Sequence, residues 1–173
     1  MLRMQQRSSG NKEVKNALSE YIDRIGTMAM LHNQLTKSDN LSEINMKEFF
    51  AQLVEITSKA TTKIEMDNIS FPVGIATPCG LIVNELITNS MKHAFKDVKE
   101  NMMKVSMAVS KGGIVNITVS DNGVGMPEGF DIEKDANTGL NLVKILVERQ
   151  LQGSYEIKSD KKGTSFTIKF KKD

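Results

Sequence analysis

The sequence is organised around NELITNSMKHAF (residues 84–95), which has the pattern of a largely buried helix. Its apolar residues continue those that precede it, so most of the helix surface is expected to pack against the rest of the protein. Thr77 and Pro78 suit the N-cap and the first position of this helix, because threonine caps free N–H groups and proline tolerates that first position. The helix is therefore expected to begin at Pro78 and to lie in the core.

Polar side chains interrupt this apolar helix. Glu85, Asn89 and Lys92 stand at i, i+4 and i+7, which places them on one face, and His93 lies beside them. A carboxylate, an amide and an ammonium group are costly on a buried helix without polar partners. They predict a charged, phosphorylated ligand against that face, although a solvated polar stripe explains the same residues equally well.

Composition narrows the class of protein. The chain has 173 residues and a formal net charge of +2, which gives no large electrostatic footprint for nucleic acid. Its apolar runs are too short for a membrane span and no signal peptide is visible, so no membrane contact is expected within this chain. The single cysteine, Cys79, excludes an internal disulfide and favours a reducing compartment, the cytoplasm.

A heptad pattern marks the N-terminal part, with apolar positions spaced alternately four and three residues apart. These seam residues are Val14, Leu18, Tyr21, Ile25, Met28, His32 and Leu35. They predict a long helix that packs on other helices, and dimerisation is the simplest way to cover it. A packed histidine is the better interpretation of His32 than a catalytic one. The polar stretch 38–43 marks the expected boundary between a helical part at 1–43 and a second domain at 44–173.

The second domain mixes helices and strands. Asn45 and Glu48 form a capping-box pattern for a helix, whose core face is expected to carry Phe49, Phe50, Leu53, Val54 and Ile56. The other predicted elements are a strand at 63–67, two strands at 103–109 and 115–121 joined through Gly112–Gly113, a helix at 138–152 ended by Gly153, and strands at 155–159 and 164–170.

The end of the strand at 115–121 carries a second candidate site. By the two-residue period of a strand, Asp121 shares a face with Val119 and the alternate apolar residues before it. A turn-forming aspartate is the ordinary alternative. The loop DNGVGMP begins there, and Gly123 and Gly125 allow a ligand to approach the backbone closely.

A third feature follows that loop. The segment 128–137 is too polar to pack and has the position of a mobile flap. The next helix starts at Thr138–Gly139, where free N–H groups and the positive dipole end favour an anion. Taken with the polar helix and Asp121, these features specify ATP: a carboxylate can accept from the adenine amine, and Asn89 suits Mg²⁺.

The motifs NELITNSMKHAF, DNGVGMP, TGLNLV and GTSFTI resemble, in order, the N, G1, G2 and G3 boxes of the GHKL, or Bergerat-fold, ATPases. They are most similar to the catalytic domain of sensor histidine kinases whose N box reads NELxxNxxKHAF. IDRIGTMAMLHNQL is similar to the second helix of the dimerisation and phosphotransfer hairpin in that subfamily. The resemblance implies an α/β two-layer sandwich, with one mixed sheet covered by helices on one face, preceded by a long helix of a helical hairpin. A P-loop is absent, which excludes the Walker-type ATPases.

The resemblance also implies roles for single residues. Glu85 takes the place of a general base or polarising carboxylate, Lys92 faces the phosphates, and Asn89 binds Mg²⁺. Phe130 belongs to a short ATP lid. The implied ATP-binding residues are Asn89, His93, Asp121, Gly123, Gly125, Met126, Thr138, Gly139, Leu140 and Thr164.

The implied function is that of a protein-histidine kinase, a homodimer that transfers the ATP γ-phosphoryl group to a histidine and then to the aspartate of a response regulator receiver domain. The acceptor segment of the family resembles HHRVKNNL, and NKEVKNAL echoes it with Asn11 and Lys12 at the histidine positions. Because MLRMQQRS fits better as the tail of the first hairpin helix, the acceptor is expected upstream of Met1, in a longer protein of which this chain is a fragment. The alternatives are another GHKL ATPase, a serine kinase of the anti-sigma type, or a non-catalytic dimerising ATP-binding module.

Overall fold

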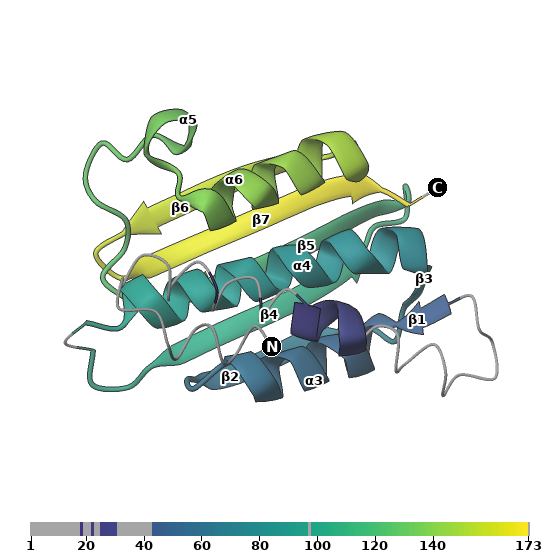
Figure 1. Ribbon diagram of the computed structural model, residues 1–173, viewed down its shortest axis with the longest axis horizontal. Helices are drawn as coiled ribbons and strands as arrows, with labels where there is room; N and C mark the ends of the chain where they lie inside the picture. Colours follow the sequence, from purple (N-terminus) through teal and green to yellow (C-terminus); the bar gives the residue numbers. More distant parts are fainter. Residues whose placement is uncertain (1–17, 19–21, 23–24, 31–42, 97, 173) are drawn as a thin grey trace.

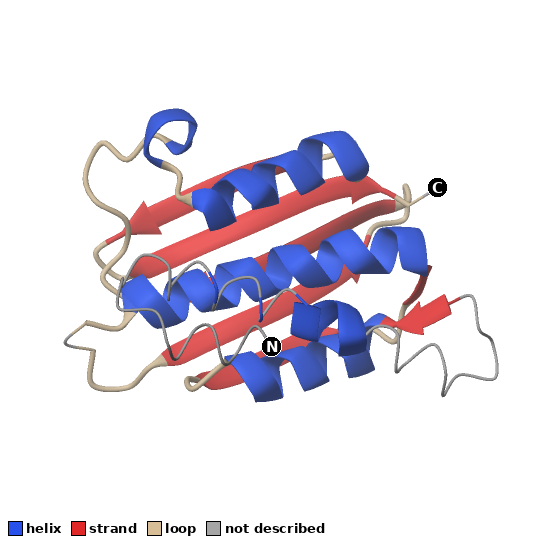
Figure 2. Ribbon diagram, in the orientation of Figure 1, coloured by secondary structure: helices blue, strands red, loops and turns tan. Residues whose placement is uncertain are grey.

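A five-stranded mixed sheet forms one layer of the protein, and three helices cover one of its faces (Figures 1 and 2). The computed structural model describes residues 18, 22, 25–30, 43–96 and 98–172. The strand order is β2-β4-β5-β7-β6, in which β2 (Thr61–Met66) runs parallel to β4 (Met102–Val109) and the other neighbours are antiparallel. The expected two-layer α/β sandwich is confirmed.

The remaining elements follow the predicted order closely. The other strands are β1 (Glu43–Asn45), β3 (Ser70–Pro72), β5 (Ile114–Asp121), β6 (Ser154–Asp160) and β7 (Gly163–Lys171). The helices are α3 (Met46–Thr57), α4 (Val73–Asn89), the short α5 (Ile132–Asp135) and α6 (Thr138–Ile145). A π-helical turn continues two of these helices: η1 (Ser90–Ala94) follows α4, and η2 (Leu146–Gln150) follows α6. The pair β1–β3, which the sequence did not predict, forms a separate antiparallel ladder.

Alternation of apolar and polar residues explains why the described helices gather on one face of the sheet. In the central strands the buried residues occupy every second position, and Val105 pairs with Val119 while Ile117 pairs with Ile168. The other face carries hydroxyls and charges, such as Glu65, which forms ion pairs with Lys63 and Lys104. Such a face needs no second layer.

Helix α3 begins as predicted, because the Asn45 side chain accepts hydrogen bonds from the backbone N–H groups of Lys47 and Glu48. Its buried stripe runs through residues 46, 49, 50 and 53, which are spaced i, i+3, i+4 and i+7. The stripe continues at Thr57 instead of Ile56. Ile56 is 70% exposed, so its predicted place in the core was wrong.

The central helix starts earlier than predicted. Helix α4 begins at Val73, and the expected start with Thr77 as N-cap and Pro78 as first residue was wrong. Pro78 lies inside the helix, where it removes one backbone donor to Gly74, and the Thr77 hydroxyl donates to the Val73 carbonyl at 2.8 Å. One missing bond near the start of a buried helix is tolerated, because packing of the helix stabilises it.

The described part of the N-terminal helix contacts the core of the second domain with one face. Thr27 is buried, and Met30 packs against the core. Ile25 and Met28, from the predicted seam, are 51% and 50% exposed.

Among the residues that the structure describes, no helix combines the length and the apolar character needed to cross a bilayer. The seam residues Val14, Tyr21, His32 and Leu35 lie outside the described residues, so dimerisation stays a prediction.

Candidate functional site

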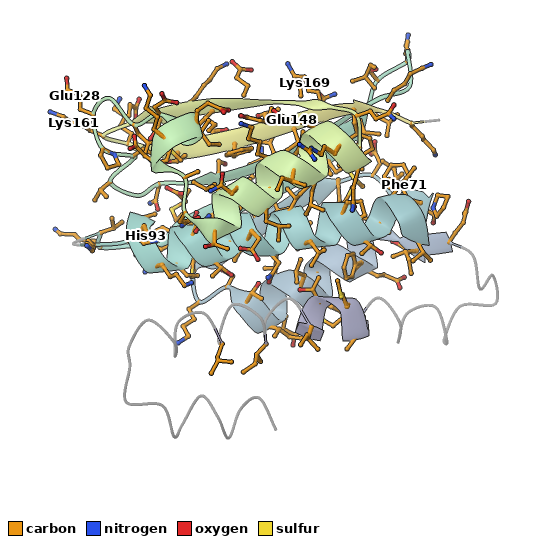
Figure 3. All side chains as sticks on the ribbon, turned by 45° about the horizontal axis from the view of Figure 1, so that its top comes forward. Phe71, His93, Glu128, Glu148, Lys161 and Lys169 are labelled. Carbon is orange, nitrogen blue, oxygen red and sulfur yellow. The ribbon has the colours of Figure 1, made fainter. Side chains whose placement is uncertain are left out.

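A cavity of about 620 Å³ opens at the end of the sheet where α4 and η1, the loop after β5, and the start of α6 meet. In Figure 3, His93 marks this end, together with Glu128 and Lys161, and Phe71 lies at the opposite end. The cavity is lined by seven of the residues proposed from the sequence: Asn89, His93, Asp121, Gly125, Met126, Leu140 and Thr164. The lining does not include Glu85, Lys92, Gly123, Thr138 or Gly139.

The Asp121 carboxylate is held by three donors. Its Oδ2 accepts a hydrogen bond from the Ser90 hydroxyl at 2.7 Å. Its Oδ1 accepts from the backbone N–H groups of Gly123 and Thr164, at 2.9 and 3.2 Å. As predicted, Asp121 lies on the face of β5 that carries Val119, toward the helices. Ser90 was not predicted, although its spacing from Leu86 and His93 places the three residues on a common helical face.

The glycine loop is fastened at both ends. Val124 N–H donates to the Ala94 carbonyl at 2.9 Å, and a Cβ at Gly123 would overlap Ala94. Gly125 has φ +78°, and a Cβ there would overlap the Asp160 carbonyl, so only glycine fits. Met126 N–H donates to Ser159 Oγ at 2.7 Å. These contacts present Gly125 and Met126 to the cavity.

The helix face that borders the cavity lies about a quarter turn away from the predicted one. Leu86, Asn89, Ser90 and His93 line it, at i, i+3, i+4 and i+7. Asn89 belongs to both faces, which is why the prediction included it. Lys92 is exposed, and Lys96 supplies the cation of the cavity wall instead.

Glu85 lies behind the cavity wall, against the start of α6. It is 4% exposed, and its Oε2 lies 2.5 Å from the position of a Cβ on Gly139. Gly139 is therefore required for close packing between α4 and α6. The carboxylate stands next to the helix N-terminus that the sequence proposed as an anion site.

Asn137 connects this helix start with the central helix. Its Oδ1 accepts from Leu140 N–H at 2.8 Å and caps α6, and its Nδ2 donates to Asn89 Oδ1 at 3.2 Å. Within the described residues, the buried Asn89 Nδ2 finds no hydrogen-bond partner. A ligand with acceptor oxygens would satisfy it.

The segment before α6 is less polar in its packing than expected. Phe130, Ile132 and Ala136 pack against the core, so the prediction that the segment is too polar to pack was wrong. These three apolar residues are separated by charged ones, so the segment shows no clear apolar periodicity in the sequence. Phe130 and Asp135 line the cavity, as the proposed lid position requires.

Two titratable groups have shifted pKa values, His93 at the cavity and Cys79 in the core. Burial lowers the pKa of His93, and the positive charges of Lys92 and Lys96 lower it further. Burial raises the pKa of the Cys79 thiol, which is fully enclosed in the core. Cys79 is therefore a packing residue and not a reactive thiol.

Two sequence families match the chain. Residues 74–173 match the family described as histidine kinase-, DNA gyrase B- and HSP90-like ATPases. The chain belongs to this ATPase family. Residues 1–61 match a histidine kinase family. The two matches confirm the expected ATP-binding region of a sensor histidine kinase.

Named relatives agree with this assignment. Sensor histidine kinase PdtaS of Mycobacterium tuberculosis is 26% identical over 178 residues, which cover 98% of this chain and 35% of the relative. PdtaS of Mycolicibacterium smegmatis is 29% identical over 162 residues, covering 89% of this chain and 32% of the relative. The chain thus spans about a third of the length of these curated relatives.

Solved structures share the fold. The histidine kinase domain of an Erythrobacter litoralis blue-light-activated histidine kinase gives a TM-score of 0.78 at 24% identity, covering 99% of this chain and 82% of that chain. Acinetobacter baumannii histidine kinase AdeS gives 0.64 at 16% identity, covering 92% of this chain and 80% of that chain. These likenesses describe the arrangement of helices and strands alone.

Proposed function

We propose that the cavity binds ATP with Mg²⁺, and that the protein transfers the γ-phosphoryl group to a histidine imidazole for relay to an aspartate of a response regulator. The observation that carries this proposal is the Asp121 carboxylate, which is fixed by Ser90, Gly123 and Thr164 in a cavity that Val119, Met126 and Phe166 also line. A fixed acceptor in apolar surroundings suits the exocyclic amine of adenine. Met126 and Thr164 border the same end of the cavity.

The phosphates are proposed to lie toward η1 and the start of α6. His93 and Lys96 border that part, Leu140 lies at the start of α6, and the helix N-terminus favours negative charge. Lys92 is exposed next to His93, and its proposed role is to add positive charge near the phosphates without lining the cavity. Thr138 and Gly139 are proposed to contribute backbone N–H groups.

Asn89 is proposed as the protein ligand of Mg²⁺. Asn89 borders the cavity and carries an amide oxygen, and no group of three or more His, Cys, Asp or Glu side chains that could hold a metal gathers in the described part of the chain. This donor set fits Mg²⁺, which keeps several waters and relies on substrate phosphates. When bound, the metal would neutralise phosphate charge.

The transfer needs positioning more than covalent chemistry from the protein. In the proposed step, an imidazole nitrogen of the acceptor histidine forms a bond to the γ-phosphorus while the bond from phosphorus to the β–γ bridging oxygen breaks, and ADP leaves. Glu85, buried beside Gly139, is proposed to act as general base or to polarise the acceptor.

The partners follow from the same proposal. A response regulator receiver domain would receive the phosphoryl group, and a second copy of the protein would pack on the helical hairpin. The exposed Ile25 and Met28 support that dimer, because they face away from the ATPase domain. We propose residues 1–43 and 44–173 as the two domains, and the cytoplasm as the location.

Calorimetric titration with Mg²⁺-ATP tests the site. Asp121→Asn should weaken binding by about 1–3 kcal/mol, because a charge-assisted hydrogen bond to the base is lost while the shape of the side chain is kept. Asp67→Asn, at an exposed position after β2, is the matched control and should bind ATP like the unaltered chain. Equal affinity of the two variants would remove Asp121 from the nucleotide site.

A further inference from the structure

Ser90 makes a hydrogen bond that its own helix does not require. A serine in a helix usually turns its hydroxyl to solvent or to the carbonyl four residues earlier. Ser90 instead donates to Asp121 Oδ2, thirty-one residues along the chain, at 2.7 Å. Ser90 is only 9% exposed and opens the π-helical turn η1 at the cavity wall. The hydroxyl is therefore committed to the carboxylate proposed to read the base.

Counting acceptor positions shows what this bond does. A carboxylate offers about four lone-pair positions, two on each oxygen. Both positions of Asp121 Oδ1 are taken by the Gly123 and Thr164 N–H groups. The Ser90 hydroxyl takes one position of Oδ2. A single acceptor position on Oδ2 is left for a ligand.

One remaining acceptor discriminates between purines. Adenine presents an amine donor at C6, which needs one acceptor. Guanine and hypoxanthine present a carbonyl oxygen at C6, which Asp121 would repel. The N–H groups of guanine at N1 and C2 pair with a carboxylate through both of its oxygens, and Oδ1 is already filled.

Ser90 fixes which position of Oδ2 stays available. The two backbone donors hold only Oδ1, so without Ser90 the carboxylate could tilt about its Cβ–Cγ bond and leave two positions of Oδ2 unfilled. A carboxylate with several allowed orientations discriminates between bases less strongly than one held in a single orientation.

We propose that Ser90 is a positioning residue that determines base specificity, by holding Asp121 so that the site prefers a purine with a C6 amine. This inference rests on the proposed function, in which Asp121 contacts the base. It predicts that Ser90 affects the ratio of affinities for two nucleotides, whereas a purely structural residue would affect both affinities equally.

The test is a set of titrations with the full chain and Mg²⁺. The probes are ATP, inosine triphosphate, which has a carbonyl at C6, and purine riboside triphosphate, which has hydrogen there. The variants are Ser90→Ala, Ser90→Cys, which retains the size but donates weakly, and Ser90→Thr, which retains the hydroxyl. Ser106→Ala, on β4, is the matched control, because Ser106 lies on the strand face opposite to the buried Val105 and Met107. Circular dichroism checks folding of each variant.

The unaltered chain should bind ATP about tenfold or more tightly than either other nucleotide. Ser90→Ala and Ser90→Cys should reduce that ratio at least about threefold, while Ser90→Thr and Ser106→Ala keep it. Ratios that do not change in Ser90→Ala and Ser90→Cys would overturn the role of Ser90 and leave ATP binding intact. Failure of the unaltered, folded chain to bind ATP would instead overturn the proposed function and this inference with it.

Discussion

Asn89 Oδ1 accepts a hydrogen bond from Asn137 Nδ2 at 3.2 Å, so the proposed metal ligand is tied to the N-cap of α6. One of the two acceptor positions of the oxygen that would coordinate Mg²⁺ is thus already in use. The Asn137 amide group beside this oxygen carries partial positive charge, so the contact should compete with a metal bound to Asn89. The start of α6 and the metal site are therefore expected to be coupled.

Two substitutions separate the capping role of Asn137 from its bond to Asn89. Asn137→Ser keeps a capping oxygen but is too short to reach Asn89, whereas Asn137→Ala loses both contacts. Asn137→Ser should lower the Mg²⁺ concentration needed for half-maximal ATP binding by about two- to tenfold, the scale of one hydrogen bond. Asn137→Ala should in addition destabilise the protein by about 1 kcal/mol.

Titration of ATP binding against Mg²⁺, with thermal unfolding alongside, measures both effects. An unchanged or higher Mg²⁺ requirement in Asn137→Ser would show that the bond to Asn89 does not compete with the metal.

His93 should make ATP binding depend on pH. Burial and the neighbouring Lys92 and Lys96 lower its pKa, so the imidazole is neutral at pH 7 in the free protein. Bound polyphosphate would favour the charged form and raise this pKa, so binding takes up a proton. ATP affinity should therefore increase as the pH falls from about 8 to 6, by about three- to tenfold more than in His93→Gln.

Calorimetry in two buffers of different ionisation enthalpy measures the proton uptake directly. His93→Gln is the control for protonation of ATP itself, which both proteins share. The lowered pKa of His93 also affects stability. As the pH falls, the unfolded chain binds a proton at this histidine at a higher pH than the folded protein does, so the free energy of unfolding decreases as the pH drops through about 6.5. Identical pH profiles of ATP binding in both proteins would exclude His93 from the phosphate end.

Two glycines of α4 are expected to respond to alanine in opposite directions. A Cβ at Gly80 would overlap the buried Phe49 ring, so Gly80→Ala should destabilise the protein by about 1–3 kcal/mol. A Cβ at Gly74 would meet no atom within 4 Å, so Gly74→Ala should stabilise it by about 0.4–1 kcal/mol. Urea unfolding of the two variants measures the difference. Equal effects would mean that Phe49 can move without cost.

The sequence predicted the parts of the site that depend on short-range periodicity. Asp121 was placed correctly because the two-residue period of β5 continues without interruption to its last residue. The position of Gly125 followed from its loop, since a positive φ there requires glycine. Both features depend only on residues close in the sequence, so strand periodicity and backbone preferences were sufficient to predict them.

Features that depend on tertiary contacts could not be predicted in this way. Pro78 was read as a helix start because proline favours that position, but packing of α4 tolerates it in the interior. Ser90 and Asn137 act through partners far along the chain, and no spacing rule identifies such pairs. The predicted cavity face of α4 was wrong by about a quarter turn. Asn89 lies at the edge of the observed face, so it is shared by the predicted and the observed faces and does not distinguish them.

The last prediction concerns the acceptor of the phosphoryl group. The chain has two histidines, and neither suits that role: His93 lines the cavity from η1, beside the proposed position of the phosphates and too close for in-line attack, and His32 belongs to the predicted seam. The 173-residue chain should therefore bind ATP without accumulating acid-labile label from γ-labelled ATP. A longer protein that carries an acceptor helix should become labelled.

In that longer protein, Glu85→Ala should slow labelling by about 10²–10⁴-fold if Glu85 acts as a general base, and ATP affinity should change much less. Asp121→Asn is the contrasting variant, because its main effect should be on affinity. Acid-labile label on the 173-residue chain itself would contradict the prediction, and His32 would then be the first residue to replace.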